Sequence, residues 1–424
     1  MKKATKKLVA AALAALMTTS ACTTFTGCKN YNADQGGNKG AALSTMPGGT
    51  AGDSPSGNGP SVEGESTESS SSVQGGGEIK PVHKNMNVLT GEPVPSDISS
   101  VRPIAIVVDN ISNAYKNQTG LDGADVLYEA LVAPGITRFV MVTADYTKLD
   151  SVCNIRSGRD YHMDFAAYHN AVLICHGGSA TVNYDFFTLA AQRYGSRWGY
   201  IDTEFEKWFY MREYGDLYGT IDNRGERKDL AYDTVFKPAA LTALISLGES
   251  KFAIRGNGTL TGKAKESLHF VEYGTKKDMS GASSAREIAL KFKCENSTTV
   301  KNVSYVYSEA QGKYLRLQDG KAHVDAQTGR QLSFANVITL FTEVKAVSTG
   351  LSSDPVMTLV ETQNSAQGYG YYFTGGRVIE IRWSADGDDL RLTEPDGSAL
   401  TMNTGNTYIG YLDDSYLSGG QFWS

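Results

Sequence analysis

Short apolar runs that end in polar turns dominate the chain from about residue 85 onward. The runs 104–108 and 171–175 are rich in aliphatic and β-branched residues, and each predicts a buried strand. The segments 161–170 and 181–194 have helical character and lie on either side of the second strand. This alternation predicts an α/β region, in which ligands tend to bind beyond the carboxyl ends of the strands.

Two further runs, 126–132 and 137–144, flank a Pro-Gly pair and predict an antiparallel hairpin. Alternation along the first of these strands places Glu129 on a face with apolar neighbours. A carboxylate in such surroundings needs a partner, and we expect Arg138, across the hairpin, to provide it.

From about residue 285 the pattern changes to short alternating strands separated by glycine-containing turns. We therefore predict an α/β fold in two domains. An N-terminal α/β domain with a mixed sheet spans 85–286, a smaller and mostly β C-terminal domain spans 287–413, and residues 414–424 form a tail.

The first residues predict export and a lipid anchor. Four lysines precede the apolar stretch 8–17, which is too short to span a bilayer, as in a signal peptide. A small residue precedes both Cys22 and Cys28, as cleavage of a lipoprotein signal requires. The polar chain begins directly after Cys28, so we favour Cys28 over Cys22 as the lipid attachment site and 1–27 as the signal peptide. An ordinary secretory signal is the alternative.

Residues 28–84 are dominated by Gly, Ser, Asn and Glu and lack the apolar content of a core, which predicts a disordered tether. Such a tether spans some 40 Å on average, at ~5–6 Å times the square root of its length. Later segments lack the roughly 18 apolar residues of a spanning helix. We expect an extracytoplasmic protein held at the cell membrane by its lipid.

Net charge and cysteine content narrow the possible partners. The formal charge is -6, and loss of the four signal-peptide lysines makes it -10, which argues against nucleic acid as a partner. Beyond the signal stand Cys153, Cys175 and Cys294, whose spacing matches neither a disulfide framework nor a zinc site. We expect buried free thiols, with Cys153 and Cys175 as the one pair that could bridge.

The strongest candidate chemistry lies in the segment 153–161, where Arg156 and Arg159 are three positions apart. On the first turn of a helix, this spacing points both guanidinium groups to one side. Arginine binds carboxylate or phosphate with two parallel hydrogen bonds. The segment therefore predicts a site for an anionic or carboxylate-bearing ligand, unless nearby acids pair with the arginines internally.

Other polar residues at predicted strand ends complete this site. A strand, a glycine-containing turn and a helix in succession are typical of anion sites, although the spacing is not that of a P-loop. The ligand-binding residues that we predict besides the two arginines are Arg138, Asp109, Asn110, Glu129, His176 and Ser179.

Metal, cofactor and catalytic signals are weak. His162 and His169 are seven positions apart, ~10.5 Å in axial rise on a helix, so one ion cannot take both. The chain has no Gly-x-Ser-x-Gly motif. We expect no metal and no cofactor, catalytic residues stay unidentified, and a non-enzymatic protein is favoured.

The chain resembles the YerB-like lipoprotein family of Gram-positive bacteria, a two-part family of largely unknown function. It departs from the family at Cys153-Asn154, where Gly-Pro is usual, and at Gly158, where Ala is usual. The resemblance implies an extracytoplasmic lipoprotein with an α/β first domain and a β-rich second domain, and it supplies no activity. The motifs that carry it include Arg102-Pro103-Ile104-Ala105, Gly135-Ile136-Thr137-Arg138, Ile155-Arg156-Ser157, Arg159-Asp160-Tyr161, His176-Gly177-Gly178-Ser179, Tyr314-Leu315-Arg316 and His323-Val324-Asp325.

We therefore predict a membrane-tethered protein that binds a cell-wall or peptide-like anionic ligand of the cell envelope. One alternative is a cell-wall hydrolase or transferase that uses an acidic residue with His176. Another is a scaffold or regulator that contacts a membrane-bound wall enzyme.

Overall fold

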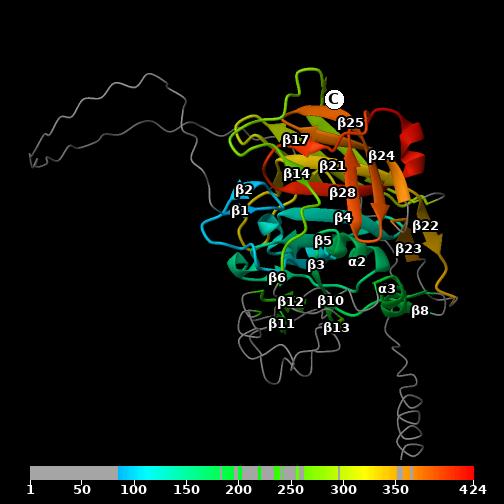
Figure 1. Ribbon diagram of the computed structural model, residues 1–424. Coiled ribbons are helices and arrows are strands. Elements are labelled where there is room, and N and C mark those ends of the chain that lie inside the picture. Colours follow the sequence, from blue (N-terminus) through cyan, green and yellow to red (C-terminus); the bar gives the residue numbers. More distant parts are fainter. Residues whose placement is uncertain are drawn as a thin grey trace, which may run out of the picture. The chain divides into compact units, whose positions relative to one another are not determined.

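The computed structural model (Figure 1) describes most of the chain after residue 84. The signal peptide, the tether and both candidate lipidated cysteines predicted above lie outside the described residues. Among described helices, none is long and apolar enough to cross a membrane. The described ranges are 85–181, 184–194, 199–202, 218–220, 234–238, 241, 255–256, 262–294, 297–350, 357–362 and 366–424.

Twelve of the described strands form one mixed sheet. The buried run predicted over 104–108 is β3 (Ile104–Asp109), which pairs parallel to β7 (Val172–Cys175). In sheet order the strands are β13 (Arg255–Gly256), β10 (Gly199–Asp202), β7, β3, β5 (Ile136–Thr143), β4 (Val126–Ala133), β28 (Thr407–Asp413), β21 (Asn336–Thr342), β24 (Ala366–Thr374), β25 (Arg377–Asp386) and β15 (Ser283–Ser284), with β26 (Asp389–Thr393) also on β25.

Strand β28, near the end of the chain, lies in the middle of this sheet, drawn in red between β4 and β21 in Figure 1. It runs parallel to both neighbours. The α/β region and the β-rich region predicted from the sequence therefore share a continuous backbone hydrogen-bond network. The predicted domain division at residue 286 stays a prediction.

The predicted hairpin is confirmed as β4 and β5, and its register fixes which side chains share a face. Glu129 lies opposite Phe139, whereas Arg138 lies opposite Ala130 and, on its other side, opposite Asp109. Because successive side chains of a strand alternate between faces, Glu129 and Arg138 point to opposite sides of the sheet.

Helices cover one face of the sheet and a second sheet covers the other. On the first face, Phe165 of α2 (Asp160–Ala167) stacks between Tyr128 and Tyr411, with ring centroids 4.6 and 4.9 Å away. On the other face, Tyr305 of the second sheet packs on Tyr408, 5.1 Å between centroids. The second sheet comprises β16 (Glu287–Phe292), β17 (Lys301–Ser308), β18 (Lys313–Gln318), β19 (Lys321–Ala322) and β20 (Ser333–Phe334).

The helix predicted over 181–194 starts later than expected. The structure forms a small hairpin first, β8 (Ala180–Thr181) with β9 (Tyr184–Asp185), and α3 spans Phe186–Tyr194. The Asp185 carboxylate accepts a hydrogen bond from the Thr188 backbone N–H at 2.6 Å, which caps the helix at this later point.

A three-stranded sheet of β11 (Tyr218–Thr220), β12 (Thr234–Phe236) and β6 (Val152–Cys153) and several two-stranded sheets complete the described fold. Cys153, Cys175 and Cys294 are all buried and stay reduced rather than bridged by a disulfide, as predicted. The remaining strands are β1 (Met86–Asn87), β2 (Glu92–Pro93), β14 (His269–Phe270), β22 (Val344–Val347), β23 (Met357–Val360) and β27 (Thr401–Met402).

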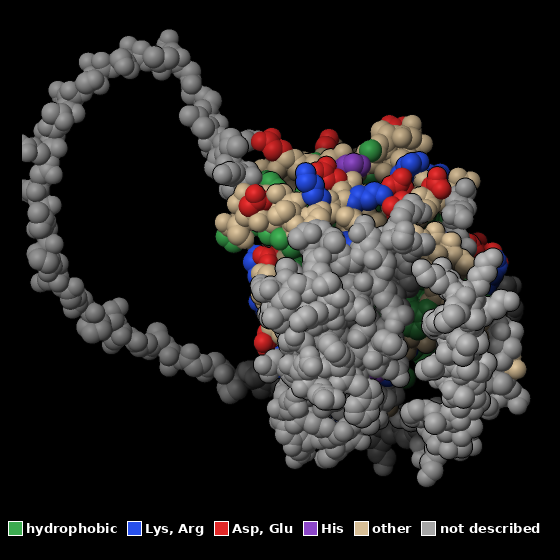
Figure 2. All heavy atoms as spheres, turned by 60° about the horizontal axis from the view of Figure 1, so that its bottom comes forward, with side chains coloured by type: hydrophobic (Ala, Val, Ile, Leu, Met, Phe, Trp, Pro, Cys, Tyr) green, Lys and Arg blue, Asp and Glu red, His purple; other side chains and the backbone are tan. Residues whose placement is uncertain are grey.

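Figure 2 shows one face of the molecule, on which the basic and acidic side chains of described residues lie intermixed. A cluster of arginine side chains lies instead inside the fold, at the carboxyl ends of β3 and β7.

Candidate anion-binding site

The segment 154–159 runs as an extended connection beside the carboxyl ends of β3 and β7. Its backbone bonds to both sides, as Arg156 N–H donates to Val107 O at 3.0 Å and Arg156 O accepts from His176 N–H at 3.0 Å. The Arg156 N–H and C=O groups are thus bonded to neighbouring strands and turns rather than within a helix. Helix α2 starts only at residue 160, with Arg159 as its N-cap. The expectation that both arginines lie on the first helical turn is therefore wrong.

Two glycines let this segment approach the turn that follows β7. Gly158 N–H donates to Gly177 O at 2.9 Å, and Gly158 forms a parallel bridge with Gly178. A Cβ atom at Gly158 would lie 2.7 Å from the ring of Phe186, and one at Gly178 would lie 2.5 Å from it. The Phe186 ring therefore leaves no room for a side chain at position 158 or 178.

Three arginines and one carboxylate meet at this place. Asp109 and Arg138 are neighbours across β3 and β5, on the face covered by α2. The Arg156 Nε lies 3.1 Å from the Asp109 Oδ2, and the Arg138 Nη1 donates to the Ser157 backbone oxygen at 2.6 Å. We call Arg138, Arg156 and Arg159 the arginine cluster.

Of the nearby acids that could have paired with the arginines, Asp109 pairs with Arg156, whereas Asp160 has other partners. Asp160 forms an ion pair with Arg193 at 2.7 Å and accepts from the Tyr184 hydroxyl at 2.8 Å. Among the described residues, Asp109 is the one carboxylate in an ion pair with the cluster. In the described part of the chain, neither Arg138 nor Arg159 forms an ion pair with a carboxylate.

Burial lowers the pKa of two arginines of the cluster. Burial lowers the pKa of Arg138 to about 9, and the charge of Arg159 is the next cause. Burial also lowers the pKa of Arg159, which is 7% exposed and whose Nη1 donates to the neighbouring Gly158 oxygen at 3.0 Å. The buried Nε atoms of Arg138 and Arg159 have no hydrogen-bond partner among described residues. Such donors are typical of a site that takes an external acceptor.

Two more predicted residues lie beside the cluster. His176 and Ser179 are half-buried and belong to the turn after β7, whose backbone bonds to residues 156 and 158. The structure thus brings together Asp109, Arg138, Arg156, Arg159, His176 and Ser179.

The structure separates Glu129 and Asn110 from this group. Both Glu129 oxygens are saturated on the opposite face of the sheet. Oε1 accepts from Asn110 at 2.8 Å and Thr137 at 2.7 Å, and Oε2 accepts from Arg316 at 2.8 Å and Tyr408 at 2.7 Å. The predicted pair of Glu129 with Arg138 is therefore wrong, because the register places them on opposite faces.

Sequence reasoning missed Arg316 of β18, the real partner of Glu129. Both side chains are completely buried. Arg316 also donates to the Tyr305 hydroxyl at 2.6 Å and to His323 Nδ1 at 3.0 Å. The family motif Tyr314-Leu315-Arg316 was the available signal. This network joins the second sheet to the large sheet.

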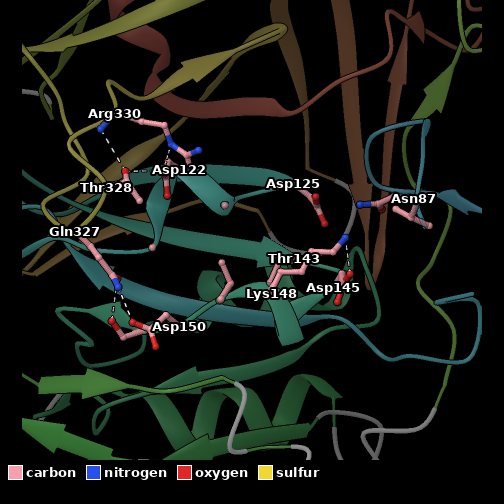
Figure 3. Close-up of a pocket in the computed structure, with 15 residues that line it drawn as sticks. Asn87, Asp122, Asp125, Thr143, Asp145, Lys148, Asp150, Gln327, Thr328 and Arg330 are labelled. Carbon is pink, nitrogen blue, oxygen red and sulfur yellow. Dashed lines mark hydrogen bonds and ion pairs between the residues drawn. The ribbon is translucent and has the colours of Figure 1, made fainter. Parts of the chain in front are cut away.

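A cavity of about 330 Å³ lies on another part of the molecule (Figure 3). Its aspartates are satisfied from within. Asp122 pairs with Arg330 at 2.6 Å, Asp145 pairs with Lys148 at 2.6 Å, and Asp150 accepts from Gln327 at 2.5 Å. The four aspartates that line the cavity outnumber its two cations, Lys148 and Arg330, so it suits an anion less well than the arginine cluster does.

Comparison with known proteins relates both regions to one family. Residues 89–198 match the N-terminal domain and residues 291–409 the C-terminal domain of DUF3048, a protein of unknown function. YerB of Bacillus subtilis (strain 168), whose name describes it as a candidate lipoprotein, is 23% identical over 326 residues, 77% of this chain and 86% of that protein. The crystal structure of the Bacillus subtilis YerB protein covers 78% of this chain and 97% of its own, with a TM-score of 0.60 at 21% identity, which shows a shared fold.

Proposed function

Because this chain belongs to the YerB-like family and carries both DUF3048 domains, we propose that it is a lipid-anchored extracytoplasmic protein that binds an anionic ligand of the cell envelope. The anchor is supported by the signal-like residues 1–27, by the cysteine that follows them and by the name of the YerB relative. Binding takes place at the arginine cluster.

The charge balance of the cluster is the observation that carries the binding proposal. A buried charge without a counter-charge is unfavourable by several kcal/mol on the order-of-magnitude scale of ion desolvation. The fold buries Arg138 and Arg159 without an ion pair to a carboxylate of the described residues, because Asp109 pairs with Arg156 and Asp160 pairs with Arg193. A ligand anion would remove this penalty.

Catalysis is less well supported than binding. An acid that works with His176 needs an available carboxylate, but Glu129 is saturated and Asp109 is ion-paired with Arg156. The hydrolase or transferase and the scaffold for a wall enzyme stay predictions.

We expect that Cys28→Ser abolishes incorporation of an alkynyl fatty acid into the protein and releases it from the membrane fraction. Two lipid chains on one cysteine give a stable anchor, whereas a single chain binds marginally. Cys22→Ser serves as the matched control and should leave labelling intact. Labelling lost in Cys22→Ser but kept in Cys28→Ser would move the attachment site.

We expect that Arg138→Met with Arg159→Met lowers the affinity for anions by about a hundredfold or more, since charge-assisted hydrogen bonds are the strong ones. The measurement is calorimetric titration of the unlipidated Cys28→Ser chain with soluble muropeptides, acetate, sulfate and inorganic phosphate. The double substitution also removes two buried cations that repel each other, so stability in urea should be retained or increased.

The matched control is Arg330→Met at the cavity of Figure 3, where affinity should not change. Equal anion affinity in the double variant and the parent chain would place the site elsewhere. Absence of binding by every anion in the panel would contradict the proposed function itself.

A further inference from the structure

We propose that the arginine cluster holds a phosphate monoester, and that His162 donates to this phosphate beside Arg138 and Arg159. The inference rests on the proposed function, because it names the ligand class of the same site.

His162 lies in the first turn of α2 and is completely buried. Its Nδ1 accepts a hydrogen bond from the Arg159 backbone N–H at 3.1 Å. Burial, followed by the charges of Arg138 and Arg159, holds the pKa of His162 well below its ordinary value, so the ring is neutral at pH 7. A neutral ring that accepts at Nδ1 carries its proton at Nε2, which makes Nε2 a donor.

Three buried donors near one another thus have no hydrogen-bond partner in the part of the chain that the structure describes. They are the Nε–H groups of Arg138 and Arg159 and the Nε2–H group of His162. A buried donor without an acceptor costs about 1–3 kcal/mol, and a charged one costs more. All three donors lie near the N-terminus of α2, so a single acceptor with several oxygens could bond to all of them.

A phosphate monoester fits this arrangement better than a carboxylate does. It offers three terminal oxygens and about -1.5 to -2 charges at pH 7, whereas a carboxylate offers two oxygens and one charge. Among the described residues, Asp109 is the one carboxylate that forms an ion pair with this cluster, and it does so with Arg156. The cluster reaches solvent through Arg156, whose side chain is 27% exposed, which suits a phosphate at the end of a larger molecule.

The first test compares anions on the full-length Cys28→Ser chain at pH 7.5 by calorimetric titration. We expect sn-glycerol 3-phosphate to bind at least about tenfold more tightly than acetate. Its phosphate has a third oxygen that can accept from the third buried donor, and a second negative charge that can balance a second guanidinium group. Acetate that binds equally or more tightly overturns the phosphate inference and leaves the proposed function standing. Absence of binding by both of these anions and by muropeptides overturns the proposed function as well.

The second test isolates His162 with a matched pair of substitutions. His162→Asn keeps an acceptor near Nδ1 but places no donor at Nε2, and we expect about tenfold or greater loss of glycerol 3-phosphate affinity. His169→Asn is the control, since both nitrogens of His169 are already bonded, to Tyr128 at 2.7 Å and to Ser267 at 2.9 Å. Its affinity should stay unchanged.

Cooperative urea unfolding checks each histidine variant, and His162→Phe provides a second version of the test if His162→Asn does not fold. Unchanged affinity in a folded His162 variant overturns the role of this residue.

A third arm distinguishes the sources of the monoester. Phosphatidylcholine vesicles, with or without phosphatidic acid, compete against glycerol 3-phosphate for the Cys28→Ser chain. Competition only by vesicles that contain phosphatidic acid supports a lipid headgroup. Equal, negligible competition by both vesicles supports a soluble monoester.

Discussion

Replacement of Arg316 by methionine is expected to lower the free energy of unfolding by about 3–5 kcal/mol, measured by urea denaturation at pH 7. The reason is that Glu129, completely buried, would lose its only cationic partner among the described residues. Tyr408, Asn110 and Thr137 would still donate to the carboxylate, but they do not carry a compensating charge.

Two controls make this expectation specific. Arg330→Met removes an arginine that is 71% exposed and paired with Asp122, and it should change stability by no more than about 0.5 kcal/mol. Glu129→Gln combined with Arg316→Met removes both charges, so the double variant should be more stable than the two separate losses predict. An Arg316→Met protein within about 1 kcal/mol of the parent would contradict the importance of this pair.

A second large effect is expected from Lys301, which is 5% exposed and donates to the Asn110 backbone oxygen at 2.8 Å. Its ammonium also lies 4.4 Å from the centre of the Tyr115 ring. Burial lowers the pKa of Lys301 to about 7 from its ordinary 10.5. Between these two values the unfolded chain binds more protons than the folded protein, so stability rises as the pH increases.

From pH 7 to pH 9 this single group should raise the free energy of unfolding by about 2 kcal/mol. The measurement compares urea denaturation of the parent chain and of Lys301→Met at both pH values. The contribution of other titrating groups cancels in the comparison. If the stability of the parent chain changes with pH no more than that of Lys301→Met, burial does not lower the pKa of Lys301 in the folded protein.

Much of the arginine cluster could be predicted from the sequence because it is built from local signals. The apolar run 104–108 places Asp109 at a strand end, and the Pro-Gly turn sets the hairpin that carries Arg138. The motif with Arg156 and Arg159 lies directly beside them. Each of these positions depends on alternation or turn chemistry over fewer than a dozen residues.

The partners of the buried charges could not be predicted in the same way. Glu129 pairs with Arg316, which is 187 positions away in the sequence, and Asp160 pairs with Arg193 across two helices. Alternation predicts that a side chain is buried, but it does not predict which distant element covers it. The assignment of Glu129 to the ligand site failed for this reason.

By itself, the sequence determined the strands, the hairpin, the glycine-containing turn and the family motifs, because these features depend on neighbours along the chain. The tertiary structure alone decided that β28 lies between β4 and β21, that Glu129 and Asn110 lie on the opposite face from the arginines, and that His162 lies beside them. Strand order and helix docking set these contacts through packing between distant segments. The periodicity of a short segment carries no information about that packing.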